Sequence, residues 1–136
     1  MIIHHQRITI IHQRRPSVQT LNEELQWLGA SLGLFSLRDK DRSCFRIFIE
    51  LLKAAKVNRP MASDELADQL NLSRGTVVHH LNKLMESGLV VCHQNRYILR
   101  VDSLETLIDD LAKDFERAAA ELKSVARDVD IFLGLR

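Results

Sequence analysis

The sequence predicts a mainly α-helical chain that carries one small β-hairpin. Apolar residues recur at spacings of three and four over most of the 136 residues, as in helices, whereas strand-like runs are short. Only five glycines and two prolines interrupt this pattern. A hydrophobic content of 46% supports one compact domain with an extra helix or two, but not two full domains.

Residues 1–35 predict a short arm followed by a helix. Ile8 to Ile11 form a β-like run that Pro16 closes, so we expect a strand or an ordered arm, paired with the hairpin, with another subunit or with nothing. Thr20 and Glu23 form a capping box at the start of the helix. Its apolar residues are spaced by four and three: Leu21, Leu25, Leu28, Leu32 and Phe35. Such a narrow seam predicts contact with another helix.

Residues 36–101 begin with two predicted helices. The first, at about 41–56, has a broad apolar stripe typical of a core helix. The stripe consists of Phe45, Phe48, Ile49 and Leu52. Pro60 follows the end of this helix, and Ser63 is the expected cap of a second, short helix. The residues of the short helix that should face inward are Leu66, Ala67 and Leu70.

A third helix and a hairpin complete this region. Ser73 is the expected N-terminal cap of the helix, and Gly88 marks its end. Its inward residues should be Val77, Leu81 and Leu84. Strands are expected at 89–92 and 96–101, joined by residues 93–95, with Tyr97, Leu99 and Val101 on one face of the second strand.

Residues 102–136 predict one long helix with a coiled-coil seam. The residues from Asp102 to Glu105 offer a cap, and apolar residues then alternate at spacings of four and three over almost four heptads. They are Leu104, Ile108, Leu111, Phe115, Ala118, Leu122, Val125 and Val129. A helix this long cannot bury such a seam against a small domain, so it needs partner helices, from the N-terminal helix and from a second copy. The alternative is an intramolecular bundle in a monomer.

The net charge of +1 hides an uneven distribution. Residues 36–101 hold eleven Lys or Arg against seven Asp or Glu, whereas residues 102–136 hold five against nine. A basic middle and an acidic tail fit a nucleic-acid surface in the first part and a different role in the second. Solvated helices with unbalanced charge are the simpler interpretation.

The order helix, short helix, turn, helix and hairpin resembles a winged helix-turn-helix domain. Residues 63–70 are similar to its positioning helix, residues 72–84 to its recognition helix, and residues 86–90 to the entry into its wing. Over about residues 41–101 the chain resembles ArsR/MarR-type transcription regulators, especially small archaeal and bacterial ArsR-like proteins. The resemblance implies a homodimeric, sequence-specific regulator that binds double-stranded DNA at an inverted-repeat operator. Helix 73–87 would enter the major groove, the wing at 89–101 would lie on the flanking backbone, and the regions 1–35 and 102–136 would support dimerisation.

The predicted contacts follow from this arrangement. With Val77, Leu81 and Leu84 buried, helix geometry turns the opposite face of helix 73–87 to solvent, and its start, with Ser73, Gly75 and free N–H groups, suits a phosphate. The expected DNA-binding residues are Ser73, Arg74, Gly75, Thr76, Val78, His79, His80, Asn82, Lys83, Arg96 and Arg100. The expected dimerisation residues are Leu21, Leu25, Leu28, Leu32, Leu104, Ile108, Leu111, Phe115, Leu122 and Val125.

The adjacent histidines, His79 and His80, point about 100° apart on a helix, so they are poorly placed to share a metal ion. His79 is expected to face nucleic acid, and His80 to be either a DNA contact or a partly buried structural residue. The motifs of known ArsR-type metal sites are absent, and the spacing of His4, His5, His12 and the Cys92–His93 pair predicts no metal site. No metal or cofactor is therefore expected, and Cys92 should pack in a half-buried strand.

No catalytic motif occurs, which argues against an enzyme. The two cysteines lack CxxC spacing, and no signal peptide or membrane-spanning run is present, so we expect a cytoplasmic protein with reduced thiols. A second hypothesis is a winged-helix protein-interaction subunit of a transcription or replication assembly. It rests on the modest positive charge of residues 71–101.

Overall fold

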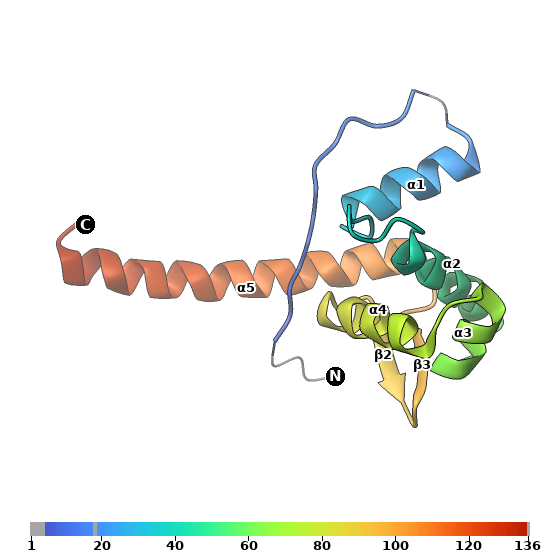
Figure 1. Ribbon diagram of the computed structural model, residues 1–136. Helices are drawn as coiled ribbons and strands as arrows, with labels where there is room; N and C mark the ends of the chain where they lie inside the picture. Colours follow the sequence, from blue (N-terminus) through green and yellow to red (C-terminus); the bar gives the residue numbers. More distant parts are fainter. Residues whose placement is uncertain (1–4, 18, 136) are drawn as a thin grey trace.

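The computed structural model describes residues 5–17 and 19–135. The elements are α1 (Leu21–Ser31), α2 (Ser43–Lys56), β1 (Met61–Ala62), α3 (Ser63–Leu70), α4 (Arg74–Glu86), β2 (Val90–His93), β3 (Arg96–Leu99) and α5 (Leu104–Leu133). Helices α2, α3 and α4 and the sheet gather into one unit, from which α5 extends as a long rod (Figure 1). The predicted mainly α-helical fold with a small β-wing is confirmed. No helix among the described residues is long and apolar enough to cross a membrane.

The core lies where α2, α3 and α4 meet. Val77, Leu81 and Leu84 of α4 have no exposed surface, which confirms the predicted inward face of this helix. Leu66 of α3 is equally buried, and Ala67 and Leu70 pack against the core while staying partly exposed. A continuous apolar contact between these helices fixes the direction in which the opposite face of α4 points.

The buried stripe of α2 differs from the prediction. Its buried apolar residues are Cys44, Ile47, Phe48, Leu51 and Ala54, whereas Phe45, Ile49 and Leu52 lie at the margin of the core. Helix α2 begins at Ser43 because the Asp39 carboxylate accepts hydrogen bonds from the backbone N–H groups of Ser43 and Cys44, both at 2.9 Å. Phe45 instead faces Phe35, with ring centroids 4.8 Å apart. It thereby connects α2 to the segment after α1.

The sheet has three antiparallel strands in the order β1-β3-β2. Strand β1, which adds to the two predicted strands, is only two residues long and was not predicted, because two residues show no alternation of apolar and polar side chains. It pairs Met61 with Tyr97 of β3. The turn between β2 and β3 is also tighter than predicted: Gln94 and Asn95, with φ of 52° and 62°, form it alone, as in a two-residue hairpin loop. Helix α3 starts at Ser63, so Ser63 is not its cap; Glu65 instead accepts from the Ala62 N–H at 3.1 Å.

The N-terminal segment is an ordered arm and not a strand. The Arg7 N–H donates a hydrogen bond to the Glu86 carbonyl at 3.0 Å, and the Ile11 N–H donates one to the Ser31 carbonyl at 2.7 Å. The arm therefore reaches from α1 to the end of α4 (Figure 1). The cap at Thr20 is confirmed, since its hydroxyl accepts from Glu23 N–H at 3.2 Å. Helix α1 is shorter than its predicted seam and leaves Phe35 outside the helix.

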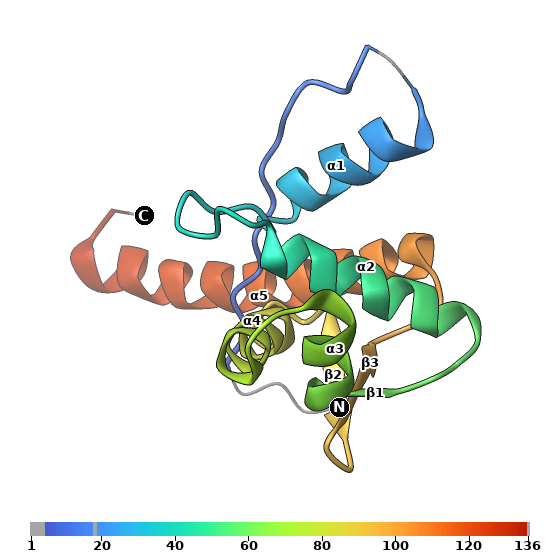
Figure 2. The ribbon, with the colours of Figure 1, turned by 45° about the vertical axis from the view of Figure 1, so that its right-hand side comes forward.

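Among the described residues, helix α5 packs on the rest of the chain only near its start. Ser103 caps it as predicted, by accepting from the Thr106 N–H at 3.2 Å. The buried residues of α5 are Leu107, Leu111 and Asp114, all in its first three turns. Beyond them the predicted seam is open: Phe115 is 55% exposed, Leu122 71% and Val125 62%. The turned view shows α1 standing apart from the C-terminal half of α5 (Figure 2), so this chain alone does not form the intramolecular bundle.

Candidate functional site

The start of α4 is exposed and is capped by Ser73. The Ser73 hydroxyl accepts a hydrogen bond from the Thr76 N–H at 3.1 Å and lies 2.8 Å from the Thr76 hydroxyl. This cap leaves other N–H groups of the first turn without helical partners. Ser73, Arg74 and Gly75 are exposed, and a Cβ atom at Gly75 would meet nothing within 4 Å. A phosphate or a base edge can therefore approach the backbone closely here.

The exposed face of α4 continues along the helix as predicted. His79, Asn82 and Lys83 are exposed, while Thr76 and Val78 are partly buried. Arg74 forms an ion pair with Asp64 of α3, with Nε and Oδ1 3.4 Å apart. Because both side chains are about three-quarters exposed, this pair contributes little and can exchange for another acceptor. The face thus offers hydrogen-bond donors and acceptors of the kinds that contact DNA.

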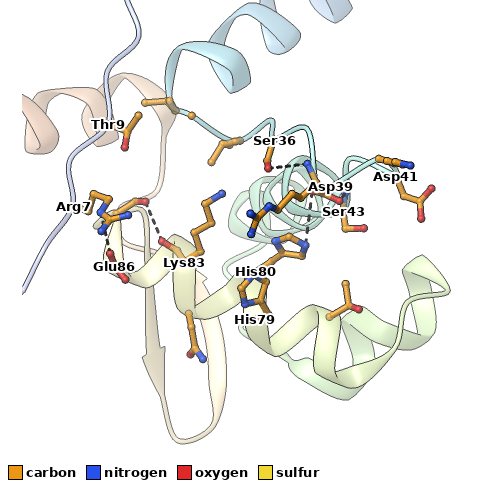
Figure 3. A pocket seen from close by; sticks show the side chains of 18 of the residues that line it. Arg7, Thr9, Ser36, Asp39, Asp41, Ser43, His79, His80, Lys83 and Glu86 are labelled. Atoms are coloured by element: carbon orange, nitrogen blue, oxygen red, sulfur yellow. Dashed lines mark hydrogen bonds and ion pairs between the residues drawn. The ribbon is translucent and has the colours of Figure 1, made fainter.

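His80 belongs to the protein interior, which supports the structural role, the second of its two predicted alternatives, over a DNA contact. The residue is 8% exposed, and its Nε2 lies 3.8 Å from Oδ2 of Asp39. Burial lowers the pKa of this imidazole, against the opposing effect of the Asp39 carboxylate. His80 therefore connects α4 to the segment between α1 and α2 (Figure 3), while His79 beside it faces outward.

Arg100 is also largely buried, which argues against its predicted contact with DNA. Strand β3 ends at Leu99, and Arg100 turns inward to form hydrogen bonds with both carboxylate oxygens of Asp114 of α5. Its side chain is 15% exposed. The predicted alternation failed because it extended the strand through Val101. Arg96 lies on the wing, 54% exposed, and its Nη1 is 3.0 Å from Oε1 of Glu65.

The prediction that Cys92 packs in a half-buried strand is wrong as well. Cys92 is exposed, whereas Cys44 of α2 is buried, and burial raises the pKa of the Cys44 thiol to about 11. His4 lies outside the described residues. Within residues 5–17 and 19–135, no three His, Cys, Asp or Glu side chains are grouped as metal ligands would be.

A cleft beside α4 is the part of the site that sequence reasoning missed. It has a volume of about 1000 Å³ and lies between the exposed flank of α4 and residues 36–41. Lys83 and His80 point from α4 toward this segment (Figure 3). Residues 38–42 form a charged run in the sequence. No sequence pattern placed it against α4.

One comparison with known proteins identifies a match. Residues 49–91 match the family model described as bacterial regulatory protein, arsR family. The matched segment runs from the middle of α2 through α3 and α4 into β2, so it contains the whole exposed face of α4. The arm, α1 and α5 lie outside it. A search of curated proteins finds no match.

Proposed function

We propose that the chain is a homodimeric transcriptional regulator that recognises an inverted DNA repeat, and the match of residues 49–91 to the domain model of the arsR family supports this proposal. A DNA-binding regulator is the function that this domain supports, rather than an enzyme. The dimer, the operator and the contacting residues are our inference. The observation that carries the proposal is the exposed face of α4. This face includes the exposed N-terminus of the helix, and its direction is fixed because the opposite face is buried in the core.

In the proposed complex, α4 enters the major groove with Arg74, His79 and Asn82 toward the bases. Arginine and asparagine side chains pair with guanine and adenine edges, and the Val78 methyl groups suit a thymine methyl. Ser73, Thr76 and the N–H groups around Gly75 would position the helix on a phosphate. Arg96 on the wing would reach the flanking backbone, since more than half of its side chain is exposed.

The exposed seam of α5 supports the dimer. Phe115, Leu122 and Val125 lie on one side of the helix and are each more than half exposed in the single chain. Contiguous apolar surface of this kind is rare on monomeric proteins, and its heptad spacing fits the same helix of a second copy. A two-fold axis through α5 would relate two α4 helices, which predicts half-sites about one helical turn, or about 10 bp, apart.

The proposal is tested by measuring the sedimentation mass of the purified chain and its gel shift with the DNA upstream of its own gene. We expect a mass of twice the 15.6 kDa chain and a specific shift that weakens as salt rises. A monomeric chain that does not bind DNA even at low salt would contradict the proposal. That result would favour the protein-interaction subunit instead.

A further inference from the structure

We propose that the cleft beside α4 holds a DNA phosphate backbone, with Arg38, Lys40 and Lys83 as the contacts. This inference rests on the proposed function and adds to it a second grip on DNA, distinct from the wing. Arg38 and Lys40 come from residues 36–42, which we call the basic segment. Lys83 comes from α4, across the cleft.

The position of the cleft relates it to the reading face. Gly75, Thr76, His79 and Asn82 line it together with Lys83, so one wall of the cleft is the flank of α4 itself. The basic segment forms the other wall. When α4 lies in a major groove, the strand that borders the groove runs beside the helix. The cleft is where that strand meets the protein.

The charges in the cleft favour an anion. Arg38, Lys40 and Lys83 are exposed, and within the described part of the chain none of them has an acidic group within 4.0 Å. The acids that line the cleft are Asp39, Asp41 and Glu86.

Two of these three acids are already engaged. Asp39 accepts from the N–H groups at the start of α2 and lies beside His80. Glu86 pairs with Arg7, with Oε1 and Nε 3.5 Å apart (Figure 3). The lining thus holds four cations, Arg7, Arg38, Lys40 and Lys83, against these three acids, and the positive excess attracts negative charge.

The basic segment is held in place without DNA. Asp39 N–H donates to the Ser36 carbonyl at 3.1 Å, and Arg42 N–H donates to the Asp39 carbonyl at 3.1 Å. The Arg42 guanidinium donates to Gln26 of α1 at 2.7 Å and lies 5.0 Å from the centre of the Phe35 ring. Because the backbone is already ordered, binding costs little further loop entropy.

The test is the salt dependence of operator affinity for Arg38→Gln combined with Lys40→Gln. Each phosphate contact contributes about 0.9 to the slope of log K against log salt, so the double variant should lower the slope by about 2 with base preference unchanged. The matched control combines Lys123→Gln with Arg127→Gln, two exposed residues on α5, and should keep the wild-type slope.

The outcomes separate this inference from the proposed function. If the wild-type chain binds its operator and the Arg38 and Lys40 variant keeps the full slope, the backbone contact is refuted and the regulator is not. If the wild-type chain binds no DNA at low salt, the proposed function fails and the contact fails with it. A slope lowered equally in the control would also refute a local contact.

Discussion

Arg100 donates hydrogen bonds to both carboxylate oxygens of Asp114, and this pair joins the end of the sheet to α5. The Asp114 side chain is 2% exposed, and the bonds from Arg100 hold the pKa of that carboxyl below its usual value. Gln6 of the arm donates to the same carboxylate at 2.9 Å and to the Ser87 carbonyl at 3.2 Å. One buried acid therefore connects α5, the base of the wing and the arm at the end of α4.

Arg100→Gln should lower the stability of the fold. The change leaves the buried Asp114 carboxylate with fewer donors, which we expect to cost roughly 2 kcal/mol in the free energy of unfolding. Urea denaturation measures this cost, and the exposed Arg127→Gln serves as the control. A variant with normal stability but a lower salt slope of DNA binding would return Arg100 to the DNA surface.

Arg74→Ala should cost about 1–3 kcal/mol in specific DNA binding and relax the base preference at one position of each half-site, if Arg74 reads a base edge. Titration of specific and random duplexes at one salt concentration measures both effects. Asp64→Asn is the control, because it removes the exposed ion pair and keeps Arg74. Equal losses on the two duplexes would assign Arg74 to a phosphate.

Phe115→Glu combined with Leu122→Glu should separate the subunits without unfolding the domain. Both side chains are more than half exposed in the single chain, so the new charges would be buried only in the proposed interface and should destabilise the dimer and not the fold. Sedimentation equilibrium should give the mass of one chain for this variant and of two chains for the control Ala120→Glu with Ser124→Glu. The control positions are exposed and lie off the seam. A seam variant that still sediments as a dimer would exclude this seam as the interface.

His80 should make stability depend on pH. Burial lowers its pKa in the folded chain below the ordinary 6.5, so the unfolded chain takes up this proton first. Neutral His80 therefore contributes its full stabilising effect above pH 6.5. This contribution to the free energy of unfolding is lost as the pH falls from 6.5 toward the lower pKa of the folded chain. The free energy of unfolding, compared between wild type and His80→Gln from pH 7.5 to 5, should therefore fall more steeply in the wild type. Parallel curves would contradict this assignment.

The sequence predicted the elements that depend on local order. The buried face of α4 is determined by the cap at Ser73 and by the spacing of Val77, Leu81 and Leu84. The exposed face could therefore be predicted as the opposite side of the helix. Contacts between distant segments were not predictable. Asp39 meets His80 across 41 positions of the chain, and Arg100 meets Asp114 because the strand ends at Leu99, two residues earlier than alternation suggested.

The central claim is that two copies of the chain place two α4 helices on one inverted repeat. Selection of bound fragments from the genome that encodes the chain tests it most directly, because it assumes no operator. We predict enrichment of an inverted repeat whose half-sites are centred about 10 bp, or one helical turn, apart. Enrichment of single, unpaired half-sites, or of no sequence at all, would contradict the claim.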